Sequence, residues 1–249
     1  LNTDQDNAII TVNMQESYRK DAQLYFKILA KKVNMELDAV GYRNCQGEII
    51  ASNPKWNREL DAWKKYFSEW IGNSNPQDIL DAAIFFDFRC IYGEKILVDQ
   101  LRTHVNKSSS ARAVFFYHMA RSINQMKISS RPVEHAMDMK RILLPVTSFI
   151  RLYAIRAGLT VTGSRERAEQ LLAKELIDPS LFEELMQAFD FITHLRIRSQ
   201  AESIARNEPP GNTIDTRQLN QIETLTLKKH LHNITSLQTR LSGEFSNTE

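Results

Sequence analysis

The spacing of hydrophobic residues along the chain changes near residue 108. Before this point, short apolar runs at residues 8–12 and 84–88 have the length and composition of β-strands. Beyond it, apolar residues recur at helical spacing in each long segment. The pattern therefore predicts an α+β protein, with a small mixed sheet in a domain over residues 1–107 and an all-α helical bundle over residues 108–249.

Two helices are predicted in the first domain, at about residues 16–38 and 54–71. Apolar residues repeat in each of them every three or four positions, which predicts a buried face. We expect the first helix to cover the N-terminal strand and the aromatic stripe of the second helix to form core. These faces consist of Leu24, Ile28, Val33 and Leu37 in the first helix, and of Trp56, Leu60, Trp63, Phe67 and Trp70 in the second.

Three long helices are predicted in the bundle. One extends over about residues 137–157 and contains Pro145. A second opens at Asp178-Pro179 and runs to about Arg206, and the last covers about residues 216–245. Long helices joined by short connections are typical of a bundle.

Composition leaves the predicted fold unchanged and excludes several classes of protein. Hydrophobic residues make up 42% and charged residues 25% of the chain, as in soluble globular proteins. Neither a membrane-spanning apolar segment nor a signal peptide is evident, so we expect a cytoplasmic protein without a membrane partner. The formal net charge of +2 is too small to indicate nucleic acid as a partner. Cys45 and Cys90 lack C-x-x-C spacing, and we expect free thiols.

Two carboxylates, Asp4 and Asp6, enter the first apolar run. Side chains two positions apart on a strand point to the same face, so the pair should share one small volume. Paired oxygen ligands on a rigid strand suit Mg²⁺ or Mn²⁺, which bind substrate phosphates as well. The alternative is a polar turn that leads into the strand, because Asp and Asn are common turn formers.

A third carboxylate, Asp87, interrupts the apolar run at residues 84–88. An ionised side chain in a buried strand needs a charged partner or a metal ion. One interpretation is an ion pair with Arg89, which would share its strand face. The other is that Asp87 joins Asp4 and Asp6 around the metal ions and accepts the proton of an attacking hydroxyl group.

Three segments resemble the nucleotidyltransferases of bacterial signal-transduction proteins with cyclic-nucleotide-binding and CBS domains. They are T-D-Q-D-N-A-I-I at 3–10, D-A-V-G-Y-R-N-C-Q-G-E-I-I-A-S-N-P-K-W at 38–56 and I-F-F-D-F-R at 84–89. That family is similar to PII uridylyltransferase and glutamine synthetase adenylyltransferase. The resemblance implies a truncated polymerase-beta-like nucleotidyltransferase sheet domain, in which Asp4 and Asp6 bind metal and Asp87 completes the site.

The second half resembles the substrate-binding domain of the same family. The matching segments are D-M-K at 138–140 and F-D-F-I-T-H-L-R-I-R-S-Q at 189–200. By this resemblance Lys140 and Arg196 contact the nucleotide, which we expect in a cleft between the two domains. Because a triphosphate needs cations, Arg89 is a competing candidate. Solvated charges or pairs within a helix are the alternative for Lys140 and Arg196.

The resemblance also implies a Gly-Ser segment immediately before Leu1 that grips the triphosphate. The chain starts without this segment, so we expect the chain alone to be inactive and regulatory domains to lie upstream. The predicted function is transfer of a nucleoside monophosphate (NMP) from a nucleoside triphosphate (NTP) to a hydroxyl group, with a protein as a candidate acceptor. The alternatives are a catalytically inactive nucleotide-sensing module and a helical interaction protein.

Overall fold

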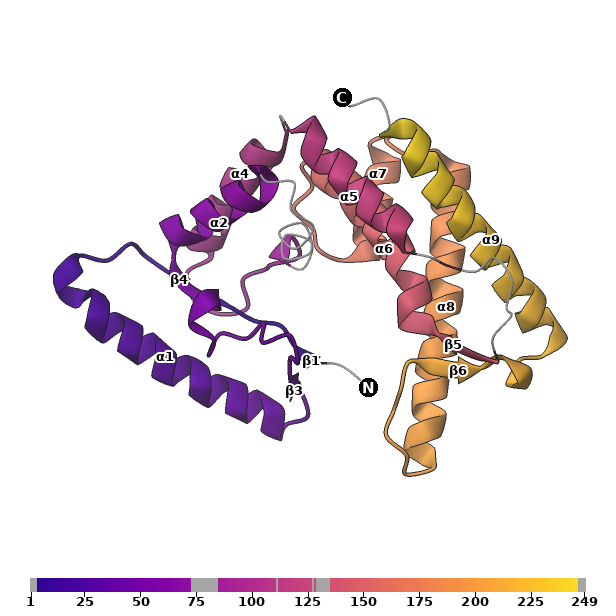
Figure 1. The fold of residues 1–249 in the computed structure, drawn as a ribbon, viewed down its shortest axis with the longest axis horizontal. Helices are drawn as coiled ribbons and strands as arrows, with labels where there is room; N and C mark the ends of the chain where they lie inside the picture. The colour runs from indigo at the N-terminus through magenta and orange to yellow at the C-terminus, as the bar shows by residue number, and fades with distance from the viewer. Residues whose placement is uncertain (1–3, 73–84, 111, 127, 129–134, 246–249) are drawn as a thin grey trace. The chain divides into compact units, whose positions relative to one another are not determined.

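The computed structural model describes residues 4–72, 85–110, 112–126, 128 and 135–245. The chain divides into two compact units, which we describe separately (Figure 1). The N-terminal unit comprises residues 3–69 and 89–108, and the helical unit comprises residues 1–2, 70–88 and 109–249. Among the described helices, none is long and apolar enough to cross a lipid bilayer.

The N-terminal unit contains two pairs of short parallel strands. Strand β1 pairs with β3, and β2 pairs with β4. Parallel strands need a long crossover connection, and helix α1 lies in the connection of both pairs. The elements of this unit are β1 (Asp4–Gln5), β2 (Ile9–Thr11), α1 (Glu16–Ala39), β3 (Arg43–Asn44), the 3₁₀ helix η1 (Pro54–Trp56), β4 (Asn57–Glu59), most of α2 (Leu60–Gly72) and most of α4 (Lys95–Ser110). The described strands of this unit thus form two-stranded pairs in place of the one mixed sheet that we expected.

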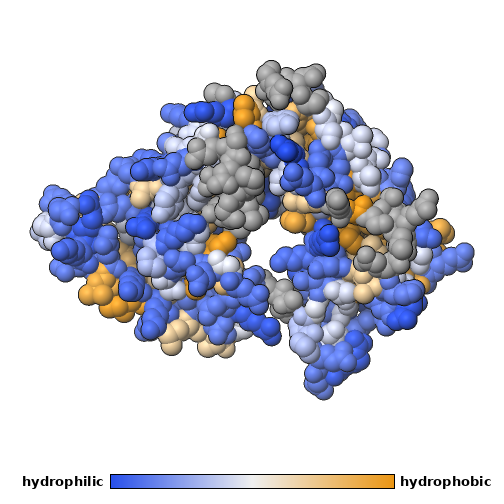
Figure 2. Space-filling model, viewed as in Figure 1, coloured by the Kyte–Doolittle hydropathy of each residue, from blue (hydrophilic) through white to orange (hydrophobic). Residues whose placement is uncertain are grey.

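Helix α1 forms where the sequence predicts it, but its buried face was predicted wrongly. Leu24 and Ile28 are 58% and 61% exposed, whereas Ala30 and Asn34 are buried. The described strands of the N-terminal unit are only two or three residues long, so they cannot cover a broad apolar face. Figure 2 accordingly shows hydrophobic atoms at the surface along α1.

The aromatic stripe that precedes and enters α2 is core, as predicted. Trp56, Leu60, Trp63, Phe67 and Trp70 are all at most 5% exposed. Trp63 also donates a hydrogen bond from its indole nitrogen to the Ile9 carbonyl at 3.0 Å, which ties α2 to β2. Burial of these rings contributes much of the apolar area of this part of the chain.

The helical unit is the expected bundle. Helix α6 packs against α5, α7, α8 and α9, and a short antiparallel pair joins β5 to β6. Figure 1 shows α8 and α9 as its long helices. The elements are α5 (Ala113–Gln125), β5 (Ala136–Asp138), α6 (Met139–Arg156), α7 (Ser164–Ala173), α8 (Pro179–Ala205), β6 (Thr213–Asp215), η2 (Thr216–Gln218) and α9 (Gln221–Glu244).

One buried histidine is expected to make the stability of this unit dependent on pH. His230 of α9 is 3% exposed, lies 5.4 Å from the Phe191 ring between centroids, and has no hydrogen-bond partner at Nδ1. Burial lowers the pKa of His230 below its ordinary 6.5, and Lys229 adds to the effect. The unfolded chain therefore binds a proton more readily than the folded chain.

We expect the free energy of unfolding to fall as the pH drops below about 6.5, and this loss to continue until His230 is protonated in the folded state. The slope from one such proton is at most about 1.4 kcal/mol per pH unit. Urea unfolding between pH 7.5 and 5 measures it. His230→Phe should flatten the slope, whereas His232→Phe, at an exposed position of the same helix, should not. Equal slopes in both variants would contradict the assignment.

Candidate functional site

Asp4 and Asp6 share the exposed side of the first strand segment. Both side chains are exposed, while Gln5 between them is 6% exposed. This alternation is the period-two pattern that the sequence predicts. It places two carboxylates side by side at the surface of the N-terminal unit.

Cys45 lies next to these two carboxylates. We call the group of Asp4, Asp6 and Cys45 the acidic face. One oxygen of Asp4, one oxygen of Asp6 and the Sγ of Cys45 all lie within 4.8 Å of one another. The parallel ladder explains the grouping, because Gln5 pairs with Asn44 and Cys45 directly follows β3. Burial raises the pKa of the Cys45 thiol, and the neighbouring Asp6 carboxylate raises it further.

The donor set of this face fits a divalent cation. Carboxylate oxygens bind Mg²⁺ and Mn²⁺ at about 2.0–2.2 Å, so three donor atoms within 4.8 Å can approach one ion after small side-chain movements. A thiolate would favour a softer metal. The sequence analysis did not link Cys45 to the two acids, because only the pairing of β1 with β3 brings it to Asp4 and Asp6. Both cysteines are free, as expected.

Asp87 lies in a helical turn of the helical unit. Phe85 is helical, and the Phe88 amide donates to the Phe85 carbonyl at 3.2 Å, so the strand predicted at 84–88 is wrong for the described residues 85–88. The apolar character was nevertheless a correct sign of burial, since Phe85 and Phe86 are 7% and 1% exposed. An apolar run of this length does not by itself distinguish a strand from a buried helical turn.

The Asp87 carboxylate is held by two arginines. Arg151 of α6 places Nη2 and Nε at 2.6 and 3.0 Å from Oδ2, and Arg167 of α7 places Nη1 at 2.6 Å from Oδ1. The Arg167 side chain is only 2% exposed, and burial lowers its pKa while Asp87 raises it. Asp87 therefore does not form the ion pair with Arg89 that was one interpretation of the sequence. Arg89 is exposed and has no ion pair among the described residues.

Lys140 and Arg196 lie near one residue, Asn212. Arg196 donates from Nε to the Asn212 side-chain oxygen at 2.7 Å, and Gln200 donates to the same oxygen at 3.2 Å. The Asn212 carbonyl accepts from the amide of Met139 at 2.8 Å, and the exposed Lys140 follows. The structure therefore brings the chain segments of these two predicted cations to the same residue, Asn212.

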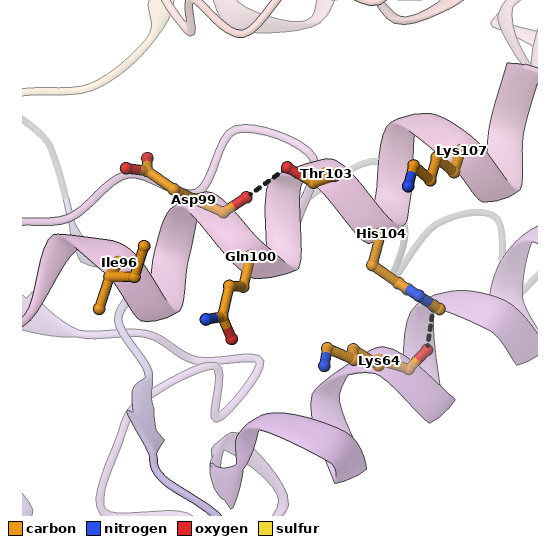
Figure 3. Close-up of a pocket in the computed structure, with 7 residues that line it drawn as sticks. All are labelled: Lys64, Ile96, Asp99, Gln100, Thr103, His104 and Lys107. Carbon is orange, nitrogen blue, oxygen red and sulfur yellow. Dashed lines mark hydrogen bonds between the residues drawn. The ribbon is translucent and has the colours of Figure 1, made fainter.

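A groove of about 400 Å³ lies between α2 and α4 (Figure 3). It is a weaker candidate for the functional site. His104 points from α4 to the Lys64 carbonyl, 3.1 Å from its Nε2, and so serves to join the two helices. Lys64 and Asp99 both take part in ion pairs within their own helices. The groove thus lacks the convergent ligands that Asp4, Asp6 and Cys45 provide.

Comparison with known proteins identifies both halves of the chain. Residues 1–77 match the family model described as "Putative nucleotidyltransferase DUF294". Residues 113–245 match the model described as "Putative nucleotidyltransferase substrate binding domain". No curated protein matches the chain. Since the second match alone covers more than half of the 249 residues, the chain belongs to the nucleotidyltransferase family that carries this substrate-binding domain.

Proposed function

We propose that the protein is a metal-dependent nucleotidyltransferase that transfers NMP from an NTP to a hydroxyl group of a protein in bacterial signal transduction. The observation that carries the proposal is the convergence of Asp4 and Asp6 on one exposed face. The family match gives the reaction class. The protein acceptor rests on the resemblance to the PII-modifying enzymes.

The reaction needs a cation and a proton acceptor. The acceptor oxygen attacks the α-phosphorus, the bond to the leaving pyrophosphate breaks, and the hydroxyl proton passes to a base. Asp4 and Asp6 would hold Mg²⁺ or Mn²⁺, which neutralises charge on the phosphates when bound. Asp87 is the proposed base. Both of its oxygens contact arginines, so the hydroxyl group would have to approach a carboxylate that is already held by two cations.

Label transfer from an NTP tests the proposed reaction. The full-length gene product is incubated with Mg²⁺, an NTP labelled at the α-phosphate, and candidate acceptor proteins. We expect label on the acceptor and equimolar pyrophosphate, both lost when EDTA removes the metal. The arginine contacts of Asp87 favour one alternative, a nucleotide sensor without catalysis. NTP binding without any label transfer would support the sensor and refute the transferase.

Cations must accompany the acidic face, because a triphosphate carries about four negative charges. We expect Lys140→Ala and Arg196→Ala each to weaken NTP affinity by about tenfold, because each substitution removes one charge-assisted hydrogen bond to the nucleotide. Equilibrium dialysis with Mg²⁺ measures this affinity. Arg165→Ala, at an exposed pair with Asp190, is the matched control and should bind normally.

Arg89 is the competing cation for the same role. If Arg89→Ala loses NTP affinity while Lys140→Ala and Arg196→Ala bind like the wild type, the helical unit does not contribute to the nucleotide site. It would then serve as a scaffold or as a docking surface for the acceptor.

A further inference from the structure

The strand that carries Asp4 and Asp6 has little support from its own ladder. Strands β1 and β3 are two residues long, and among the described residues they pair only through Asp4 with Arg43 and Gln5 with Asn44. Such a short strand pair is not stable by itself. In addition, two ionised carboxylates at this distance repel each other when no cation lies between them. Something else must hold the acidic face in place.

Gln5, the buried residue between the two acids, is the centre of a hydrogen-bond network. Its Nε2 lies 3.0 Å from the Asn34 carbonyl, 2.9 Å from the Tyr42 carbonyl and 3.1 Å from Oδ1 of Asn44. Its Oε1 accepts from Nδ2 of Asn34 at 2.6 Å and from Nδ2 of Asn7 at 3.0 Å. A buried amide is tolerated only when its donors and acceptor are satisfied, as they are here.

Asn34 connects this network to helix α1. It is 3% exposed, and its Nδ2 also donates to Oδ1 of Asn7 at 2.9 Å. Its Oδ1 accepts from the amide of Ser52 at 3.0 Å, while Oδ1 of Asn7 accepts from the amide of Ala51 at 2.8 Å. The three amide side chains thus tie β1 to α1 and to the loop at residues 51–52.

The network reaches each member of the acidic face through its chain neighbour. Gln5 lies between Asp4 and Asp6, and Asn44 immediately precedes Cys45. A satisfied set of buried amides is rigid, because every rotation would break hydrogen bonds without water to replace them. Rigid support of ligand residues raises affinity, since the ligands need not be ordered on binding.

We propose that Gln5 and Asn34 are positioning residues that hold Asp4 and Asp6 in the geometry that binds a divalent cation. The inference rests on the proposed function, in which these carboxylates bind the metal. Neither residue contacts the cation. Their loss lowers metal affinity because the repelling carboxylates are then free to separate.

Electron paramagnetic resonance (EPR) of Mn²⁺ titrated into residues 1–249, without nucleotide, tests the proposal. We expect Asn34→Leu and Gln5→Met each to weaken Mn²⁺ binding by about tenfold. This is the low end of the affinity losses that follow mutation of residues supporting metal ligands. The spectrum of the bound ion should broaden as its ligand geometry becomes heterogeneous. Leucine favours helix more than asparagine does, so α1 itself is not weakened.

The matched control is Asn57→Leu. Asn57 also ties a strand to α1, through a 3.1 Å hydrogen bond from Nδ2 to the Phe26 carbonyl, but it takes no part in the network. Circular dichroism and thermal unfolding show whether each variant folds. Asn57→Leu should lose comparable stability and keep the Mn²⁺ affinity of the wild type.

The outcomes separate this inference from the proposed function. If Asp4→Asn abolishes Mn²⁺ binding but the Asn34 and Gln5 variants bind like the wild type, the positioning role is wrong and the metal site stands. If the wild type binds no more Mn²⁺ than Asp4→Asn, the metal site is wrong as well. If Asn34→Leu fails to fold, Gln5→Met and Asn7→Ala, which leave α1 unchanged, test the positioning role. Wild-type Mn²⁺ affinity in both of these variants would contradict it.

Discussion

Replacing Asp87 by alanine is expected to lower the free energy of unfolding of the helical unit by about 3–5 kcal/mol. The substitution leaves Arg151 and Arg167 without their shared carboxylate, and the Arg167 side chain is 2% exposed. A buried charge that loses its partner cannot be compensated by water. Urea unfolding followed by circular dichroism measures the change.

Two further variants identify the cause. Asp190→Ala removes the partner of Arg165, but both side chains are about half exposed, so we expect a much smaller loss of stability than for Asp87→Ala. Asp87→Ala combined with Arg167→Met should recover part of the stability, because the unpaired charge is gone. If Asp87→Ala did not change the free energy of unfolding, the two arginine contacts would not stabilise this segment.

Neutralising both acids of the exposed face should have the largest effect on function. We expect Asp4→Asn combined with Asp6→Asn to reduce label transfer by the full-length protein at least about a hundredfold, since a cation contributes several kcal/mol to the stabilisation of charge in the transition state. Both side chains are exposed, so stability should change by less than about 1 kcal/mol.

Asp99→Asn is the control for this loss. Asp99 is an exposed carboxylate of the same unit, paired with Lys95 at 3.3 Å and unrelated to the acidic face. Its neutralisation should leave transfer unchanged. Equal rates in the double variant and the wild type would remove Asp4 and Asp6 from the reaction.

The sequence predicted those features that depend on local spacing. The alternation of Asp4, Gln5 and Asp6 follows from strand geometry, and the aromatic stripe around Trp63 and Phe67 follows from helical periodicity. Both patterns are short-range, so no knowledge of distant segments was needed.

Features that depend on distant partners could not be predicted. The Asp87 segment was predicted as a strand from its apolar residues alone, and its arginines come from α6 and α7, more than sixty residues away. Cys45 reaches the acidic face only through the pairing of β1 with β3. The buried face of α1 was missed because it centres on a polar residue, Asn34, whose partner Gln5 lies 29 residues earlier.

The most direct test of the central claim is an EPR titration of Mn²⁺ into the protein in the presence of an NTP. The claim is that Asp4 and Asp6 hold the cation that accompanies the triphosphate. It predicts that the wild type binds Mn²⁺ more tightly than the nucleotide alone does, and that Asp4→Asn with Asp6→Asn abolishes this gain. Identical titrations for the wild type and the double variant would contradict it.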